Sequence, residues 1–335
     1  MSDQFTIKLH GVRGSIPAPL SSDDIEGKVK RALQKASPED ISDDEAIDRF
    51  ITTLPRIDRG TVGGNSTCIQ ITVGGHELFF DGGSGCFRMA SELFAGPFGR
   101  GRGEAHWFIT HTHHDHLVGI PMFGPLYIPG NQFHFISPIE DLEHRFQRYY
   151  HTHFFPVPFQ ALGSKIDFIT LEKDQAYILK PIENNENNEN KEDNIVIRWL
   201  PNDHPGASYS YRIEYKGKIV VFSTDAEYKQ LSFQALKPVE EFFRDADVLI
   251  FDAQYAFTES VAMKRDWGHS SSMVGIDLAL DAAVKKLLLF HHDPTFSDET
   301  LEKNLVQARK YLQNMEPGSP LEVDLAIEGD IISLL

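Results

Sequence analysis

Histidine and aspartate are concentrated in residues 109–119, which read ITHTHHDHLVG. The histidines begin directly after residues 106–110, whose apolar composition predicts a β-strand. Residues two apart in an extended chain point to the same side, so His111 and His113 can bind one metal ion. Asp115 and His116 lie beyond a turn and can reach a second ion. Imidazole and carboxylate ligands without thiolates suit zinc, manganese or iron, so these residues predict a metal site without selecting the metal.

Three further candidate ligands each end an apolar run that predicts a strand. His204 follows residues 195–200, Asp225 follows residues 218–222, and His291 follows residues 286–290. Taken singly, each of them could be an ordinary loop residue at the end of a strand. Side chains that meet at one edge of a sheet from distant parts of the sequence are what a two-metal hydrolytic site requires. At the last position, alternation along the strand favours His291 over His292 as the ligand.

The elements that must position these residues are short strands and a few helices. Strands are predicted at residues 5–10, 67–73, 77–80, 106–110, 195–200, 218–222, 247–251 and 286–290. The last four are dense enough in apolar residues for interior strands covered on both faces. A helical pattern occupies residues 273–284, and a final helix begins at Ser297 and ends before Pro317. This order predicts an α/β fold with stacked sheets inside and helices outside.

Two segments stand apart from this pattern. Residues 19–59 predict a helical insertion, because Ile25, Val29 and Leu33 recur at helical spacing and a capping-box pattern opens a second helix at residues 42–45. Residues 183–193 contain no apolar residue and predict a low-complexity surface loop. We expect the whole chain, residues 1–335, to form one domain around these segments.

Composition and charge limit the class of function. The chain has 335 residues, of which 41% are hydrophobic, so it can bury a substantial core. Its 32 basic and 49 acidic residues give a net charge of −17, the wrong sign for a protein that binds long nucleic acid by neutralising many phosphates. The two cysteines, Cys68 and Cys86, form no CxxC pair and exclude a disulfide scaffold or a thiolate zinc site. No apolar run approaches the roughly 18 residues of a membrane span, and no secretory pattern opens the sequence, so we expect a cytoplasmic protein without membrane contact.

The segment from His111 to His116, followed by His204, Asp225 and His291, resembles the signature of the metallo-β-lactamase-fold hydrolases. The resemblance covers the chain from about residue 5 to its end, outside the two segments set apart above. It implies a four-layer αββα sandwich.

Finer features are similar to the ribonuclease Z-like and cyclic-phosphate phosphodiesterase branch of that family. They are the turn-rich loop at residues 11–17, the segment at residues 63–67, and the run Gly268-His269-Ser270-Ser271. Asp225 at the position that bridges the metals argues against a true β-lactamase. The chain lacks the long Gly/Pro/Lys-rich arm with which ribonuclease Z holds transfer RNA, and this departure, like the net charge, argues against a long RNA substrate.

The resemblance also implies a role for each candidate residue. The first metal ion would be bound by His111, His113 and His204, and the second by Asp115, His116 and His291, with Asp225 as the bridge. Asp115 would also orient or deprotonate the attacking water, and His269 would contact the scissile phosphate and stabilise charge or protonate the leaving oxygen. The expected cofactors are two divalent ions, with zinc favoured and manganese or iron as alternatives.

We therefore expect a di-metal-dependent hydrolase. The leading hypothesis is a phosphodiesterase that acts on a small phosphodiester, cyclic phosphate or nucleotide through a metal-bridging hydroxide, and a homodimer is compatible with the sequence. Hydrolysis of a lactone or thioester is an alternative that leaves His269 without a clear task. A non-hydrolytic di-metal binding or sensing protein is a further alternative, although the redox members of the family carry an acidic residue where His113 stands.

Other polar residues have less specific patterns. Residues 145–157 interleave arginine, aromatic residues and histidine, which is compatible with a lid that stacks bases or holds phosphate, although the pattern favours aromatic packing of a helix end against the core. Asp252 ends an apolar strand and could accept a hydrogen bond from a metal-bound histidine or simply cap the strand. His114 should point away from the ligands on either side of it. The histidines treated as ordinary surface or partly buried residues are His10, His76, His106, His134 and His144.

Overall fold

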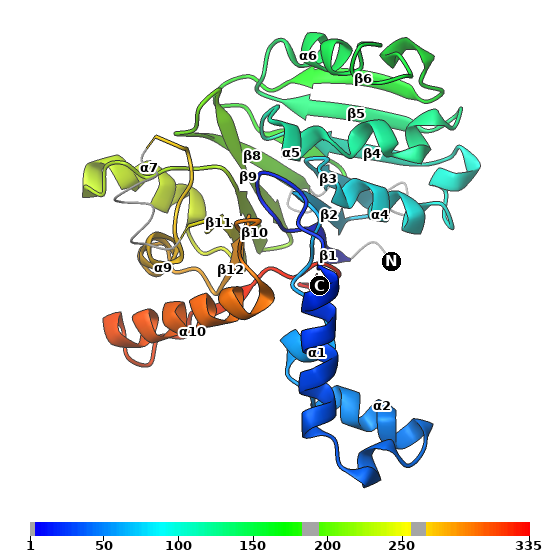
Figure 1. The fold of residues 1–335 in the computed structure, drawn as a ribbon. Helices are drawn as coiled ribbons and strands as arrows, with labels where there is room; N and C mark the ends of the chain where they lie inside the picture. The colour runs from blue at the N-terminus through cyan, green and yellow to red at the C-terminus, as the bar shows by residue number, and fades with distance from the viewer. Residues whose placement is uncertain (1–3, 183–193, 256–265) are drawn as a thin grey trace.

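Two seven-stranded β-sheets packed face to face form the centre of the molecule, and helices cover their outer faces (Figure 1). The computed structural model describes residues 4–182, 194–255 and 266–335, so the loop predicted at residues 183–193 lies outside the described residues. The layers confirm the α/β fold class and the four-layer αββα arrangement expected from the sequence.

The first sheet consists of β1 (Phe5–Gly11), β2 (Cys68–Val73), β3 (His76–Phe80), β4 (Glu104–Phe108), β5 (Gln132–Ser137), β6 (Lys165–Thr170) and β14 (Ile331–Ser333). Their spatial order is β14-β1-β2-β3-β4-β5-β6. Pairing is antiparallel from β14 to β3 and parallel from β3 to β6. The helices on this side are α4 (Gly85–Leu93), α5 (His114–Leu117) and α6 (Leu142–Tyr149) (Figure 1).

The second sheet consists of β7 (Tyr177–Leu179), β8 (Ile195–Asn202), β9 (Ser208–Tyr215), β10 (Lys218–Ser223), β11 (Val248–Asp252), β12 (Lys286–Phe290) and β13 (Glu322–Leu325). Their spatial order is β13-β12-β11-β10-β9-β8-β7, antiparallel from β7 to β10 and parallel from β10 to β13. The helices α7 (Phe233–Phe243), α9 (Ser272–Asp281) and α10 (Asp298–Met315) cover its outer face (Figure 1). Short 3₁₀ turns connect elements at Pro38–Ile41, Phe98–Arg100, Ile120–Met122, Gly124–Tyr127 and Phe159–Ala161.

The core explains why these apolar runs become strands. One cluster of fully buried side chains joins the inner faces of the two sheets and continues to α9 and α10. Phe80 stacks on Phe108 within the first sheet at 5.1 Å and meets Phe222 of the second sheet edge-on at 5.9 Å. A second cluster lies under α4 and α6, with Trp107 between Phe123 and Phe135. Burial of these rings on both sides of the first sheet fixes the register of its central strands.

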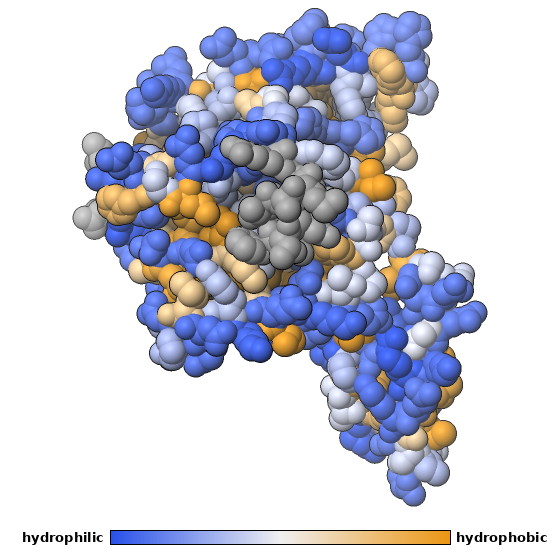
Figure 2. Space-filling view, turned by 60° about the vertical axis from the view of Figure 1, so that its left-hand side comes forward, coloured by the Kyte–Doolittle hydropathy of each residue, from blue (hydrophilic) through white to orange (hydrophobic). Residues whose placement is uncertain are grey.

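Residues 22–59 form an arm of helices that projects from the sandwich: α1 (Ser22–Lys35), α2 (Asp44–Thr53) and α3 (Arg56–Arg59) (Figure 1). Ser21 caps α1 through a capping box with Asp24. The arm is tied to α10 by Lys28, whose Nζ lies 2.7 Å from Asp298 Oδ2. The apolar positions of α1 are half exposed or more, and Figure 2 shows the arm as a largely hydrophilic projection with hydrophobic side chains at its edge.

One strand differs from its prediction. Residues 195–200 were expected to be covered on both faces, and this is wrong for β8, in which Ile195 and Ile197 are buried but Arg198 is exposed. The reason is its place beside the edge strand β7 in the antiparallel part of the sheet, where only one face meets the core. The parallel strands β10, β11 and β12 are buried almost throughout, as expected.

Candidate metal centre

The candidate ligands meet at the edge where the parallel strands of both sheets end. His111 follows β4, Asp225 follows β10 and His291 follows β12. The chain after His113 turns into the short helix α5, and this single turn directs Asp115 and His116 inward. Because the carboxyl ends of neighbouring parallel strands lie at the same edge of a sheet, residues far apart in the sequence converge there.

The first group of candidate ligands contains His111, His113, His204 and one oxygen of Asp225. Asp225 Oδ2 lies 3.6 Å from His111 Nε2 and 3.6 Å from His204 Nε2. His204 Nε2 lies 3.0 Å from His113 Nδ1. Three imidazole nitrogens and a carboxylate oxygen therefore surround one point.

The second group contains Asp115, His116 and His291, and the other oxygen of Asp225 belongs to it by distance. Asp225 Oδ1 lies 3.2 Å from both His116 Nε2 and His291 Nε2. Asp115 Oδ2 lies 3.3 Å from each of the same two nitrogens. The carboxylate of Asp225 thus directs one oxygen to each group, the geometry of a ligand shared by two ions.

The donor atoms of the two groups fit divalent metal ions. The ligand atoms of the first group lie within 4.8 Å of one another, and so do those of Asp115, His116 and His291 in the second. His111 Nε2 is buried and has no hydrogen-bond partner, which is costly for a buried polar atom unless something else binds it. Nitrogen and carboxylate donors at this separation suit zinc, manganese or iron.

The ring nitrogens that point away from the centre are also engaged. His116 Nδ1 lies 2.7 Å from Asp81 Oδ2, and His204 Nδ1 donates to Gly268 O at 2.8 Å. His291 Nδ1 lies 3.1 Å from Gln254 Oε1. Such partners fix the tautomer and ring orientation of metal-binding histidines, so the surroundings are built for ligation through the opposite nitrogen.

Asp81 is a functional residue that sequence reasoning missed. It follows β3, is fully buried, and also accepts hydrogen bonds from the backbone N–H of Thr110 at 2.8 Å and from its hydroxyl at 2.7 Å. Its only sequence signal is an acidic residue directly after the apolar end of a strand. Pairing of β3 with β4 brings it beside His116, a relation that local spacing does not reveal.

His269 lies beside both groups, with a carboxylate behind it. Its Nδ1 lies 2.9 Å from Asp252 Oδ2 and 3.8 Å from Asp225 Oδ2. Burial alone would lower the pKa of His269, but Asp252, Asp225 and Asp115 together outweigh burial and raise this pKa to about 9. Asp252 therefore holds His269 through Oδ2, while its Oδ1 lies 4.0 Å from Nδ1 of the candidate ligand His291.

The backbone at the site is held in an uncommon conformation. Asp81, Asp225 and His291 have positive φ values of 54°, 49° and 59°, which side chains with a Cβ seldom adopt outside constrained sites. Gly268 has φ of 86°, and a Cβ there would lie 2.2 Å from His204 Nδ1. The close packing of the candidate ligands therefore explains the positive φ values at these strand ends and the need for glycine at position 268.

Electrostatics in the site couple the histidines to the carboxylates. Burial alone would lower the pKa of His116, but Asp225, Asp115 and Asp81 hold it well above its ordinary value. Burial alone would raise the pKa of Asp225, but His291, His116 and His111 hold it well below its usual range. These histidines therefore favour the ionised form of Asp225, whereas burial raises the pKa of Asp81.

The neighbouring histidines take other places. His292 is buried outside the cluster, and its Nε2 donates to Ala326 O at 2.9 Å. Burial lowers the pKa of His292 to about 3, so this ring is neutral. His114 is exposed and bonds to the Tyr149 hydroxyl at 3.1 Å, away from the ligands on either side of it.

A hollow of about 460 Å³ opens onto the centre. Its lining includes Ser15, His113, Gln254, Trp267 and His269. Ser15 N–H donates to Asp115 Oδ2 at 2.7 Å and so fixes that carboxylate from the glycine-rich loop after β1. The hollow is large enough for a small substrate and places it between His269 and the candidate ligands.

Comparison with known proteins identifies related sequences and folds. A family model described as a beta-lactamase superfamily domain matches residues 76–292. Ribonuclease Z from Bacillus cereus (strain G9842) is 31% identical over 107 residues, which cover 32% of this chain and 32% of that protein, so the chain matches only about a third of the relative's length.

Solved structures extend the likeness to nearly the whole chain. The metallo-beta-lactamase fold protein YhfI from Bacillus subtilis superimposes with a TM-score of 0.61 at 19% identity, over 99% of each chain. A diphosphatase from the PhnP family gives a TM-score of 0.56 at 14% identity, over 99% of this chain and 97% of its own. At these identities the structures show a shared fold. No helix within the described parts of this chain is both long and apolar enough to cross a membrane.

Proposed function

The chain belongs to the beta-lactamase superfamily and has its metallo-β-lactamase fold, and from this premise we propose that it is a di-metal phosphodiesterase acting on a small phosphodiester, cyclic phosphate or nucleotide. The superfamily and the folds it shares support a metal-dependent hydrolase. The bond that is cleaved and the number of ions are the parts that we propose.

The division of Asp225 between two groups of ligands is the observation that carries the proposal. Its Oδ2 faces His111 and His204, and its Oδ1 faces His116 and His291. A site for one ion would not need a second set of inward-facing imidazoles around the other oxygen. When bound, two divalent ions supply Lewis acidity and a water of lowered pKa, the combination that phosphodiester hydrolysis uses.

The surrounding residues supply the remaining roles. Asp115, fixed by the backbone N–H of Ser15, would orient the attacking water and accept its proton. His269, with Nδ1 held by Asp252, lines the hollow and would donate a proton to the leaving oxygen as the phosphorus–oxygen bond breaks. A cationic His269 also offsets negative charge that develops on the phosphate, which matters in a chain of net charge −17.

The size of the hollow and the acidic surface favour a small substrate over a long nucleic acid. The ribonuclease Z relative is named for action on RNA, which agrees with phosphodiester chemistry. Hydrolysis of a thioester expels a thiolate that leaves without a proton, so it would give the His269–Asp252 pair no such task, and the likeness to ribonuclease Z favours a phosphodiester over a lactone. We therefore place phosphodiester hydrolysis first.

Substitution of His269 tests the proposal. We expect His269→Ala to retain its bound metal and to hydrolyse a cyclic nucleotide, whose leaving oxygen is an alkoxide that needs a proton, about 10²–10⁴-fold more slowly, the usual effect of removing a positioned acid. His144→Ala, at an exposed histidine of α6, is the matched control and should behave as the unaltered protein. Retained phosphodiester turnover together with loss of thioester turnover in His269→Ala would contradict the assignment.

A further inference from the structure

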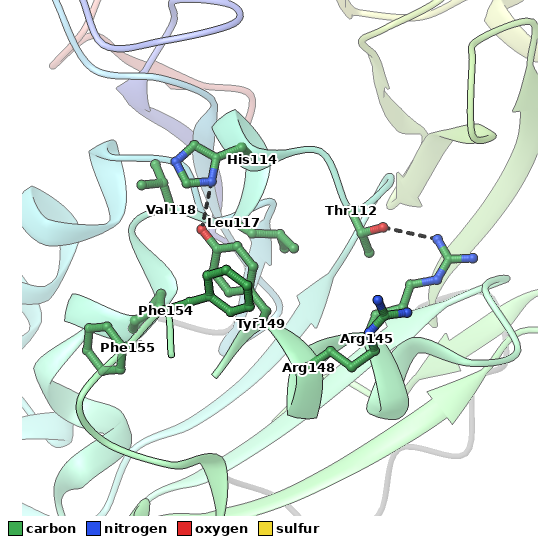
Figure 3. Close-up of a pocket in the computed structure, with 10 residues that line it drawn as sticks. Thr112, His114, Leu117, Val118, Arg145, Arg148, Tyr149, Phe154 and Phe155 are labelled. Atoms are coloured by element: carbon green, nitrogen blue, oxygen red, sulfur yellow. Dashed lines mark hydrogen bonds between the residues drawn. The ribbon is translucent and has the colours of Figure 1, made fainter. Parts of the chain in front are cut away.

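A second hollow, of about 610 Å³, lies between the ligand-bearing loop and helix α6 (Figure 3). Its lining combines aliphatic, aromatic and cationic side chains: Thr112, His114, Leu117, Val118, Pro121, Arg145, Arg148, Tyr149, Phe154 and Phe155. It takes in part of residues 145–157, for which the sequence left open a base-stacking or phosphate-holding role. The role proposed above for the metal centre leaves this hollow unused.

The loop that holds the candidate metal ligands forms one wall of this hollow. Thr112 and His114 line it, whereas His113 between them lines the hollow at the metal centre. The two hollows therefore lie on either side of the step from His113 to His114, and both of these residues are exposed, so the step lies at the surface. A substrate that has its scissile phosphate at the metals can therefore extend across this step.

Helix α6 and the segment after it form the other wall. Arg145 donates from Nη1 to Thr112 Oγ1 at 3.0 Å, and the Tyr149 hydroxyl bonds to His114 Nδ1 at 3.1 Å. These bonds attach α6 to the metal-ligand loop at two points. The wall is therefore positioned relative to the metal centre.

The side chains in the hollow are divided by type. Figure 3 shows Tyr149, Phe154 and Phe155 toward one end and Arg145 and Arg148 toward the other. The ring of Phe154 is 82% exposed. The guanidinium of Arg148 forms no hydrogen bond or ion pair with any residue that the structure describes. An exposed ring and an unpaired cation in one concavity match a ligand with a planar aromatic part and an anionic part.

We propose that this hollow binds the nucleotide unit adjacent to the scissile phosphodiester, with the base against Phe154 and Tyr149 and a phosphate on Arg148. The inference rests on the proposed function, since it extends the substrate of the same site. It narrows the substrate class to phosphodiesters that carry a nucleobase and a further phosphate. In a chain of net charge −17, Arg148 provides the local positive charge that such an anion needs, whereas the charge of Arg145 is offset by Asp141, whose Oδ1 lies 2.8 Å from Arg145 Nε.

Binding of nucleoside monophosphates to the full-length, zinc-loaded chain tests the proposal by calorimetry. The probes are 5′-AMP and 5′-UMP, with adenosine lacking the phosphate and ribose 5-phosphate lacking the base. We expect Phe154→Ala to weaken AMP binding about 5- to 150-fold, the range for loss of one stacking platform. We expect Arg148→Ala to reduce the preference for AMP over adenosine. Both side chains are exposed, so neither change should affect folding.

Matched controls are Phe87→Ala on α4, where the ring is 61% exposed, and Arg49→Ala on the helical arm. Both should bind AMP as the unaltered chain does. Equal AMP affinity in Phe154→Ala, Arg148→Ala and these controls would overturn the nucleotide site, as would ribose 5-phosphate binding as tightly as AMP.

The binding assay needs no turnover, so it separates this inference from the proposed function. AMP bound through Phe154 and Arg148 in a chain that cleaves no phosphodiester would support the nucleotide site and contradict the phosphodiesterase. Phosphodiester turnover with AMP affinity unchanged in both variants would support the phosphodiesterase and overturn the nucleotide site.

Discussion

Asp81 is a residue outside the candidate ligand set that contacts the candidate ligand His116 directly and reaches His111 through the Thr110 hydroxyl, so its substitution tests the positioning of the ligands. Its carboxylate accepts three hydrogen bonds, from His116 Nδ1 at 2.7 Å and from the backbone and hydroxyl of Thr110 at 2.8 and 2.7 Å. Asp81→Asn keeps the size of the side chain but leaves one carbonyl oxygen as acceptor. His116 then loses the anion that keeps its proton on Nδ1 and leaves Nε2 free for a metal.

The expected magnitude follows from these contacts. Loss of such a partner typically costs 10- to 100-fold in metal affinity or activity, which corresponds to about 1.4–2.7 kcal/mol. An amide oxygen can accept two of the three hydrogen bonds, so one buried donor is left unpaired and the free energy of unfolding should fall by roughly 1–3 kcal/mol. We therefore expect a folded, moderately destabilised protein with a weakened second metal site.

Zinc affinity by chelator competition and turnover of bis-p-nitrophenyl phosphate measure the effect. Asp247→Asn is the control, because Asp247 is also buried but lies before β11 and accepts from Ile219 N–H and Lys285. It should lose stability without losing zinc affinity. If Asp81→Asn binds two zinc ions as tightly as the unaltered chain and retains full turnover, then Asp81 does not position His116 and the reasoning is refuted.

Three further predictions concern the ligands and the core. Asp225→Ala should lose at least one ion per chain by elemental analysis, because both groups of ligands share this carboxylate; two ions and full activity in the folded variant would contradict the shared site. His291→Ala should lower zinc affinity and turnover about 10–100-fold or more. His292→Ala should lower both by a smaller factor, because His292 bonds to Ala326 O and not to the metal centre. The reverse ranking would show that His292, and not His291, is the ligand. Burial lowers the pKa of His106 to about 3, whereas the pKa of this side chain in the unfolded chain is about 6.5. Between these two pH values the unfolded chain binds one proton more than the folded protein. The free energy of unfolding should therefore fall as the pH drops from 6.5 toward 3, by up to about 1.4 kcal/mol per pH unit. His106→Gln should make denaturant-derived stability less steep over this range by about that amount, and an unchanged slope would contradict the neutral, buried state of His106.

Local sequence patterns predicted which residues would meet at the candidate site, because local geometry places them. His111 and His113 share one side of an extended segment, and one helical turn brings in Asp115 and His116. His204, Asp225 and His291 could be recognised because apolar runs predict where strands end. Each of these positions depends on where a buried strand ends, and the run of apolar residues before it shows this directly in the sequence.

The partners of these ligands depend on strand pairing and could not be found in the same way. Asp81 meets His116 because β3 and β4 pair in parallel with Phe80 opposite Phe108. Gly268 and Gln254 bond to ligands that are distant in the sequence. Strands β5, β6 and β9 were also not predicted, since residues such as Arg212 and Asp167 interrupt their apolar pattern and the sheet register alone completes them.

The dependence of phosphodiester hydrolysis on bound metal tests the central claim most directly. The chain is freed of metal by a chelator, then titrated with zinc, manganese or iron while metal content and turnover of bis-p-nitrophenyl phosphate are measured on the same samples. We predict that turnover is absent without metal and reaches its plateau at two ions per chain, and that Asp225→Ala does not reach this plateau. A plateau at one ion, or turnover of a thioester but of no phosphodiester at any metal content, would contradict the account.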